Sequence, residues 1–161
     1  MTVLGIDPGV NKLGYGIIEE KNGSFKVLNF EHISPLKKFS FKEKLKYLHS
    51  KLEDIFNKYN PDVVAIEEIY LAKNVQIALK IGEVTGMIIG LGLKRGIEFF
   101  LIPAREVKKN VVGTGAATKE QVKFMVENLA KVKGIKSFDE SDALAVAISY
   151  IALKKENDLL Y

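Results

Sequence analysis

The segment that most constrains the fold is residues 4–18, LGIDPGVNKLGYGII, where two apolar runs flank an aspartate and a Pro-Gly pair. Two such runs joined by a short turn predict adjacent antiparallel strands buried in a sheet. Asp7 ends the first strand, and a carboxylate buried there without a partner would cost several kcal/mol, roughly. Asp7 therefore needs either a structural partner or a cation.

The rest of the chain alternates strands with helices. Asn22-Gly23 is a strong hairpin signal and predicts a third strand over residues 25–33. Ser40 and Glu43 form a capping-box pattern before leucines spaced three to four residues apart. The expected elements that follow are a helix over 40–59, a strand over 61–69, a helix over 75–96, a strand over 97–104, and helices starting at Thr118 and near Asp139. This order predicts an α/β fold, with a five-stranded mixed sheet flanked by helices on both faces.

Length and composition limit the class of protein. A chain of 161 residues is about one domain long. It contains no cysteine, which excludes disulfides and cysteine-based zinc sites and favours a cytoplasmic location. The N-terminus has no secretory signal pattern. The most apolar stretch, residues 81–93, is shorter than a membrane span and contains Glu83, so we expect a soluble protein.

The positive charge is concentrated in one segment. The whole chain has a net charge of +4, whereas residues 103–136 contain eight basic and three acidic residues, a net of +5. A basic segment on an otherwise near-neutral chain suggests a polyanionic partner such as nucleic acid. A solvated lysine-rich face is an equally good explanation from charge alone.

Four carboxylates fall where the predicted sheet could bring them together: Asp7, Glu67, Asp139 and Asp142. Each has a structural explanation by itself, as a turn cap, a solvated strand end or a helix-start acid. Together, strand-end acids and two more from one helix turn would need hard cations to stay ionised. Ligand sets made only of oxygen hold Mg²⁺ or Mn²⁺ for phosphoryl chemistry, and two ions can share an in-line displacement.

An ordered set of motifs carries a family resemblance. GIDPG, AIEEIYLAKN, ALKIGEVTG, AREVKKNVVGTGAATKEQV and ESDALAVAI occur in this order between about residues 2 and 152. The set resembles the RuvC family of Holliday-junction resolvases. GIDPG alone is weak evidence, but the ordered set is specific.

The resemblance implies a ribonuclease-H-like fold and a nuclease that cuts four-way DNA junctions with two Mg²⁺ ions, for which Mn²⁺ can substitute. We expect residues 1–155 to form the single nuclease domain and residues 156–161 a short C-terminal tail. The implied catalytic and metal-binding residues are Asp7, Glu67, Asp139 and Asp142. Some relatives carry His at the place of Asp139. Relatives can have Gln at the place of Glu68, which leaves the role of Glu68 open.

The resemblance also implies residues that bind DNA and residues that pair two chains. Lys108 and Lys119 match family positions implicated in activity, and Tyr70 stands where a Phe is thought to stack on unpaired bases. Further expected DNA contacts are Lys73, Arg105, Lys109 and Lys123. The glycines in positions 82, 86 and 90 recur every four residues in one predicted helix, and we expect Gly82, Gly86 and Gly90 to lie at a homodimer interface. A branch-migration helicase complex is the implied protein partner.

Two other functions compete with this interpretation. Actin-like sugar or acetate kinases also carry an aspartate in a glycine-rich turn after the first strand, but they need a second domain that 161 residues do not supply. A non-catalytic module that binds branched DNA would be marked by the loss of one or more acids, and all four are present. His32 and His49 are predicted to lie away from the acids and receive no role.

Overall fold

The computed structural model describes residues 1–69 and 74–159, with side chains described up to residue 156. Its elements are β1 (Thr2–Asp7), β2 (Leu13–Lys21), β3 (Ser24–Ile33), α1 (Phe41–Tyr59), β4 (Val63–Glu68), α2 (Val75–Leu93), β5 (Glu98–Pro103), α3 (Ala104–Val112), α4 (Lys119–Leu129) and α5 (Phe138–Leu159). The strands form one sheet in the order β3-β2-β1-β4-β5. β1 pairs antiparallel with β2 and parallel with β4, so the sheet is mixed, as predicted.

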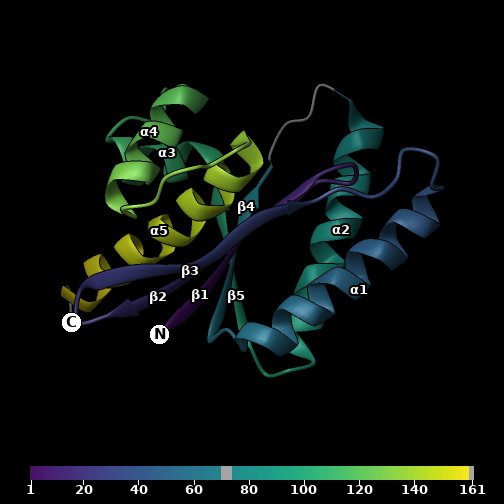
Figure 1. Ribbon diagram of the computed structural model, residues 1–161, viewed down its shortest axis with the longest axis horizontal. Helices are drawn as coiled ribbons and strands as arrows, with labels where there is room; N and C mark the ends of the chain where they lie inside the picture. Colours follow the sequence, from purple (N-terminus) through teal and green to yellow (C-terminus); the bar gives the residue numbers. More distant parts are fainter. Residues whose placement is uncertain (70–73, 160–161) are drawn as a thin grey trace.

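Helices cover both faces of this sheet. Figure 1 shows α1 and α2 on one face and α3, α4 and α5 on the other. Each face has its own apolar core, the first built around Leu48, Leu52 and Ile88 and the second around Leu144 and Val146. The central strand β1 contributes to both cores, because its successive side chains point to opposite faces.

The hairpin turn and the helix caps that the sequence predicted are present in the structure. Asn22 and Gly23 both have positive φ, as a two-residue hairpin turn requires. The Ser40–Glu43 capping box closes the start of α1, and Thr118 and Gln121 form the second box at α4. These signals are local, so tertiary packing did not need to be known to read them.

Two helices differ from the sequence prediction. α3 was not predicted, because it is only nine residues long and Pro103, before its first residue, makes no side-chain capping bond. α5 continues to Leu159. Residues 156–159 therefore continue this helix, and the division into a nuclease domain of residues 1–155 and a tail of residues 156–161 stays a prediction.

α2 stands out among the helices for its apolar surface. Within the described ranges it is the one helix long and apolar enough to cross a membrane, judged by length and composition alone. It nevertheless packs on the sheet through Val84, Ile88 and Leu91, which are buried in the core with α1. Apolar residues on its outward side, such as Val75, Leu79 and Leu93, are exposed to solvent.

Glycines let α5 lie directly against the strands. A Cβ on Gly14 of β2 would overlap the backbone carbonyl oxygen of Asp139, and one on Gly5 of β1 would overlap that of Ala143. Both obstacles are helix backbone, which cannot move without moving α5.

We therefore expect Gly14→Ala to push the first turn of α5 away from β2. The free energy of unfolding should fall by about 1–3 kcal/mol, the usual cost of overpacking. Chemical denaturation measures this loss. Gly92→Ala is the control, because a Cβ there would meet its nearest neighbour, the backbone oxygen of Ile97, at 3.5 Å, an ordinary contact distance. An unfolding energy for Gly14→Ala equal to that of the wild type would contradict the close contact.

Candidate active site

Two neighbouring strands end in carboxylates at the same edge of the sheet. Ile6 of β1 pairs with Ile66 of β4 in parallel register, so Asp7 and Glu67 leave the two strands side by side. Asp142 reaches them from the start of α5. All three line a cavity of about 270 Å³ together with Lys108 and Lys119. The structure thus brings together three of the four predicted acids and two of the predicted lysines.

Asp7, Glu67 and Asp142 together are called the acid group here. Burial and the repulsion between these carboxylates keep one of them, Asp7, protonated. Burial, followed by the charges of Glu67 and Asp142, raises the pKa of Asp7 from 3.8 to about 9, and a hydrogen bond to Glu67 adds to the shift. Burial and Asp142 also raise the pKa of Glu67. Because two adjacent buried carboxylates cannot both ionise without a counter-charge, Asp7 keeps its proton and donates a hydrogen bond to Glu67.

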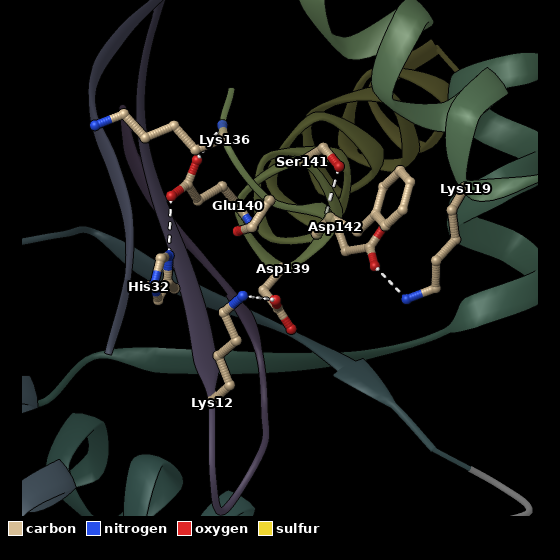
Figure 2. A network of polar contacts seen from close by, with 10 residues as sticks. Lys12, His32, Lys119, Lys136, Asp139, Glu140, Ser141 and Asp142 are labelled. Atoms are coloured by element: carbon tan, nitrogen blue, oxygen red, sulfur yellow. Dashed lines mark hydrogen bonds and ion pairs between the residues drawn. The ribbon is translucent and has the colours of Figure 1, made fainter. Parts of the chain in front are cut away.

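Asp142 has a lysine partner. Its carboxylate Oδ2 lies 3.1 Å from Nζ of Lys119. A dashed line in Figure 2 marks this ion pair. Burial raises the pKa of Asp142, and the Lys119 ammonium opposes that shift. Lys119 is the first residue of α4, after a loop that begins at Gly113 with φ +95°. The loop that begins at Gly113 therefore places this lysine beside the acids from a helix N-terminus.

Asp139 lies beside the cavity and does not line it. Its Oδ2 is 3.0 Å from Nζ of Lys12, in the turn between β1 and β2, and its side chain is 28% exposed. Asp139 still raises the pKa of Asp7 through its charge. Asp139 and Asp142 share the first turn of α5, as predicted, but each faces a different lysine (Figure 2).

Comparisons with known proteins agree on one family. The family described as Crossover junction endodeoxyribonuclease RuvC matches residues 3–150. The chain belongs to the RuvC family. The curated RuvC of Caldicellulosiruptor saccharolyticus is 42% identical over 153 residues, which are 94% of this chain and 92% of that protein. The RuvC of Chloroherpeton thalassium is 40% identical over 149 residues, 92% of this chain and 80% of that protein.

Solved structures give the same result. The RuvC structure of Thermus thermophilus superposes with a TM-score of 0.87 at 27% identity, covering 98% of this chain and 97% of that one. The same protein in complex with a Holliday junction gives a TM-score of 0.91 at 26% identity, covering 98% and 96%. The resemblance identified in the sequence and the predicted ribonuclease-H-like sheet are confirmed.

The oxygen donors suit the divalent metal that membership of the RuvC family implies. Asp7, Glu67 and Asp142 offer carboxylate oxygens alone, the donor type that Mg²⁺ and Mn²⁺ prefer. Burial raises the pKa of all three groups, and a divalent cation would favour their ionised forms. In the described part of the chain, no three such side chains stand at the spacing of a formed metal site. The donor chemistry of Asp7, Glu67 and Asp142 nevertheless fits a divalent metal, which these three carboxylates would hold.

The remaining predicted DNA contacts lie on the two helices that border this cavity or fall outside the described residues. Arg105 and Lys109 are exposed on α3, the helix that carries Lys108, and Lys123 is half-buried on α4. Tyr70 and Lys73 lie outside the described residues, and their predicted roles stay predictions. Glu68, the last residue of β4, does not line the cavity.

Sequence reasoning missed one contact of His32. It was expected to lie away from the four candidate acids, and its Nδ1 is 3.0 Å from Oε1 of a different carboxylate, Glu140, which lies between Asp139 and Asp142 in the chain. The hairpin signal at Asn22-Gly23 predicts that β3 pairs with β2, but it does not predict the register shift between Ile17 and Ile18 that places His32 opposite Gly14. Gly14 also pairs with Asp7 of β1, so His32 falls on the same row of residues as Asp7.

Proposed function

We propose that this protein is a crossover junction endodeoxyribonuclease that resolves four-way DNA junctions by paired, symmetric nicks near the crossover. The observation that carries the proposal is the buried acid group of Asp7, Glu67 and Asp142, which faces a cavity lined by two lysines. The RuvC relatives share nearly the full length of this chain, and one was solved in complex with a Holliday junction.

Asp7, Glu67 and Asp142 would hold two Mg²⁺ ions, or Mn²⁺ in their place, with Asp139 at the edge of the site. Such ions supply an activated water and stabilise the leaving oxygen of a phosphodiester. Lys108 and Lys119 place ammonium groups in the same cavity, where they can bind the oxygens of the scissile phosphate. Because bound metal ions would neutralise the Asp142 carboxylate, Lys119 could leave Asp142 and bind the phosphate. The products would be 5′-phosphate and 3′-hydroxyl ends.

The test is cleavage of a synthetic four-way junction by purified protein with Mg²⁺. We expect two nicks, placed symmetrically on opposed strands, that a DNA ligase can seal. A linear duplex of the same sequence serves as control and should stay intact. Degradation of the duplex at the same rate would show a general nuclease, and binding without nicks in either metal would show a non-catalytic module.

We further propose that the protein acts as a homodimer through α2. Val75, Leu79 and Leu93 are 74%, 63% and 58% exposed. Together with Gly82, Gly86 and Gly90 they recur every three to four residues and so share one face of the helix. A Cβ on any of these three glycines meets no atom within 4 Å. A second copy of α2 could therefore approach closely along an apolar stripe, and a two-fold pair of sites would match a junction cut on two strands.

Gly86→Arg should convert the dimer to a monomer, because the long charged side chain would occupy the centre of this stripe. Light scattering after size-exclusion chromatography measures the mass. Ser50→Arg puts the same side chain on the exposed surface of α1 and should leave the dimer intact. A Gly86→Arg protein that still elutes as a dimer would place the interface elsewhere.

We also propose a cytoplasmic role in homologous recombination and DNA repair, alongside a branch-migration helicase complex. Four-way junctions arise in these processes and are moved along DNA by branch migration, so a resolvase and such a complex meet on the same substrate.

A further inference from the structure

Glu140 is a buried carboxylate that the proposed chemistry does not use. It is 4% exposed and lies in the first turn of α5, between Asp139 and Asp142. It does not line the cavity of the acid group. A carboxylate taken out of water at such a place must have its charge and hydrogen bonds satisfied by the protein.

Both oxygens of Glu140 are bonded within the protein. Nδ1 of His32 on β3 donates to Oε1 at 3.0 Å, and the backbone N–H of Lys136 donates to Oε2 at 2.8 Å. Figure 2 shows Glu140 turned toward His32, on the opposite side of the turn from the Asp142–Lys119 pair. Glu140 is thus tied to the sheet through its side chain and to the segment before α5 through the backbone of Lys136.

His32 stands at a defined place relative to Asp7. His32 of β3 pairs with Gly14 of β2, and Gly14 pairs with Asp7 of β1, so the three residues form one row across the sheet. The first turn of α5 lies over this row. Glu140 bonds to His32, the backbone of Asp139 touches the place where Gly14 lacks a Cβ, and Asp142 faces the cavity of Asp7.

We propose that the His32–Glu140 pair is a positioning device that sets the first turn of α5 along this row, so that Asp142 faces Asp7 and Glu67 while Asp139 lies at the edge of the cavity. The inference rests on the proposed function in that these acids bind the metal. His32 and Glu140 touch neither metal nor DNA in this proposal. They act through the orientation of the two aspartates, as hydrogen-bonded partners behind metal ligands do.

Metal binding by the full-length protein without DNA tests the proposal directly. We expect His32→Ala to weaken Mn²⁺ affinity by about tenfold, measured by calorimetry or by the signal of unbound Mn²⁺ in electron paramagnetic resonance. The Mn²⁺ concentration for half-maximal junction cleavage should rise by a similar factor. Junction affinity measured in Ca²⁺ should stay within about twofold, since no DNA contact is removed.

Variants separate positioning from simple stabilisation. His32→Asn keeps an N–H donor near Oε1 and should restore a large part of the Mn²⁺ affinity, whereas Glu140→Gln keeps the shape but loses the charge and should resemble His32→Ala. His49→Ala removes the other histidine of the chain, which lies on α1 across the sheet, and should match the wild type.

A His32→Ala protein that melts at a lower temperature but binds Mn²⁺ within twofold of the wild type would overturn the proposal, because the pair would then only stabilise the fold. If His32→Ala does not fold, Glu140→Gln decides the question by the same measurement. A wild-type protein that binds Mn²⁺ but cuts no junction would overturn the proposed function alone. A wild-type protein that binds no Mn²⁺ would overturn both.

Discussion

Asp7→Asn should lower the rate of junction cleavage by at least about a thousandfold and leave junction binding intact. The amide has nearly the shape of the carboxylic acid but cannot carry the negative charge that holds a divalent ion. Metal-ion stabilisation of developing charge contributes several kcal/mol, and each 1.36 kcal/mol corresponds to about tenfold in rate. Single-turnover cleavage of a labelled junction in Mg²⁺ measures the loss, and a gel-shift assay in Ca²⁺ measures binding.

Asp54→Asn is the matched control, since Asp54 is an exposed carboxylate on α1, the helix on the opposite face of the sheet from α5, and does not line the cavity. It should cleave at the wild-type rate. Cleavage by Asp7→Asn within about tenfold of the wild type would refute the assignment of the acid group. A parallel loss of junction binding would instead show that Asp7 supports the fold or the DNA surface.

The metal-free protein should become less stable as the pH rises from about 4 to about 9. In the folded state the pKa of Asp7 is raised from 3.8 to about 9, by burial first and then by Glu67 and Asp142. Between these values the folded protein holds a proton that the unfolded chain has released. Stability therefore falls by up to roughly 1.4 kcal/mol for each pH unit, and the effect ends above the folded pKa.

Asp7→Asn cannot release this proton, so its stability should depend less on pH and should exceed that of the wild type near pH 8. Thermal melting in EDTA at several pH values measures the difference, and 1 kcal/mol corresponds to about 2–4 °C for a chain of this size. Excess Mg²⁺ should raise the melting temperature of the wild type more than that of the variant. Parallel melting curves for the two proteins across this pH range would contradict the buried acid group.

Local sequence signals predicted most of the fold. The hairpin at Asn22-Gly23, the capping boxes of α1 and α4 and the alternation of strands and helices are each encoded within a few residues. α3 escaped prediction because it is short and lacks a side-chain cap. The extension of α5 to Leu159 has no sharp stop signal before it, so its end could not be read from the sequence.

The sequence predicted which residues form the site, but not which partners those residues contact. Strand ends and helix turns placed Asp7, Glu67 and Asp142 together from spacing and topology. Sequence spacing also put Asp139 on the same turn, but it could not show that Lys12 would bind it. The Glu140–His32 contact joins residues 108 positions apart, and only the register of β3 on β2 reveals it.

The close seating of α5 on the glycines of β1 and β2 also makes the acid group depend on the docking of one helix. Asp7 and Glu67 belong to β1 and β4, whereas Asp142 belongs to α5, the last element in the described order. A chain that ends before α5 would carry Asp7 and Glu67 alone and an uncovered glycine surface on β1 and β2. We therefore expect such a chain to bind no divalent metal and to cut no junction.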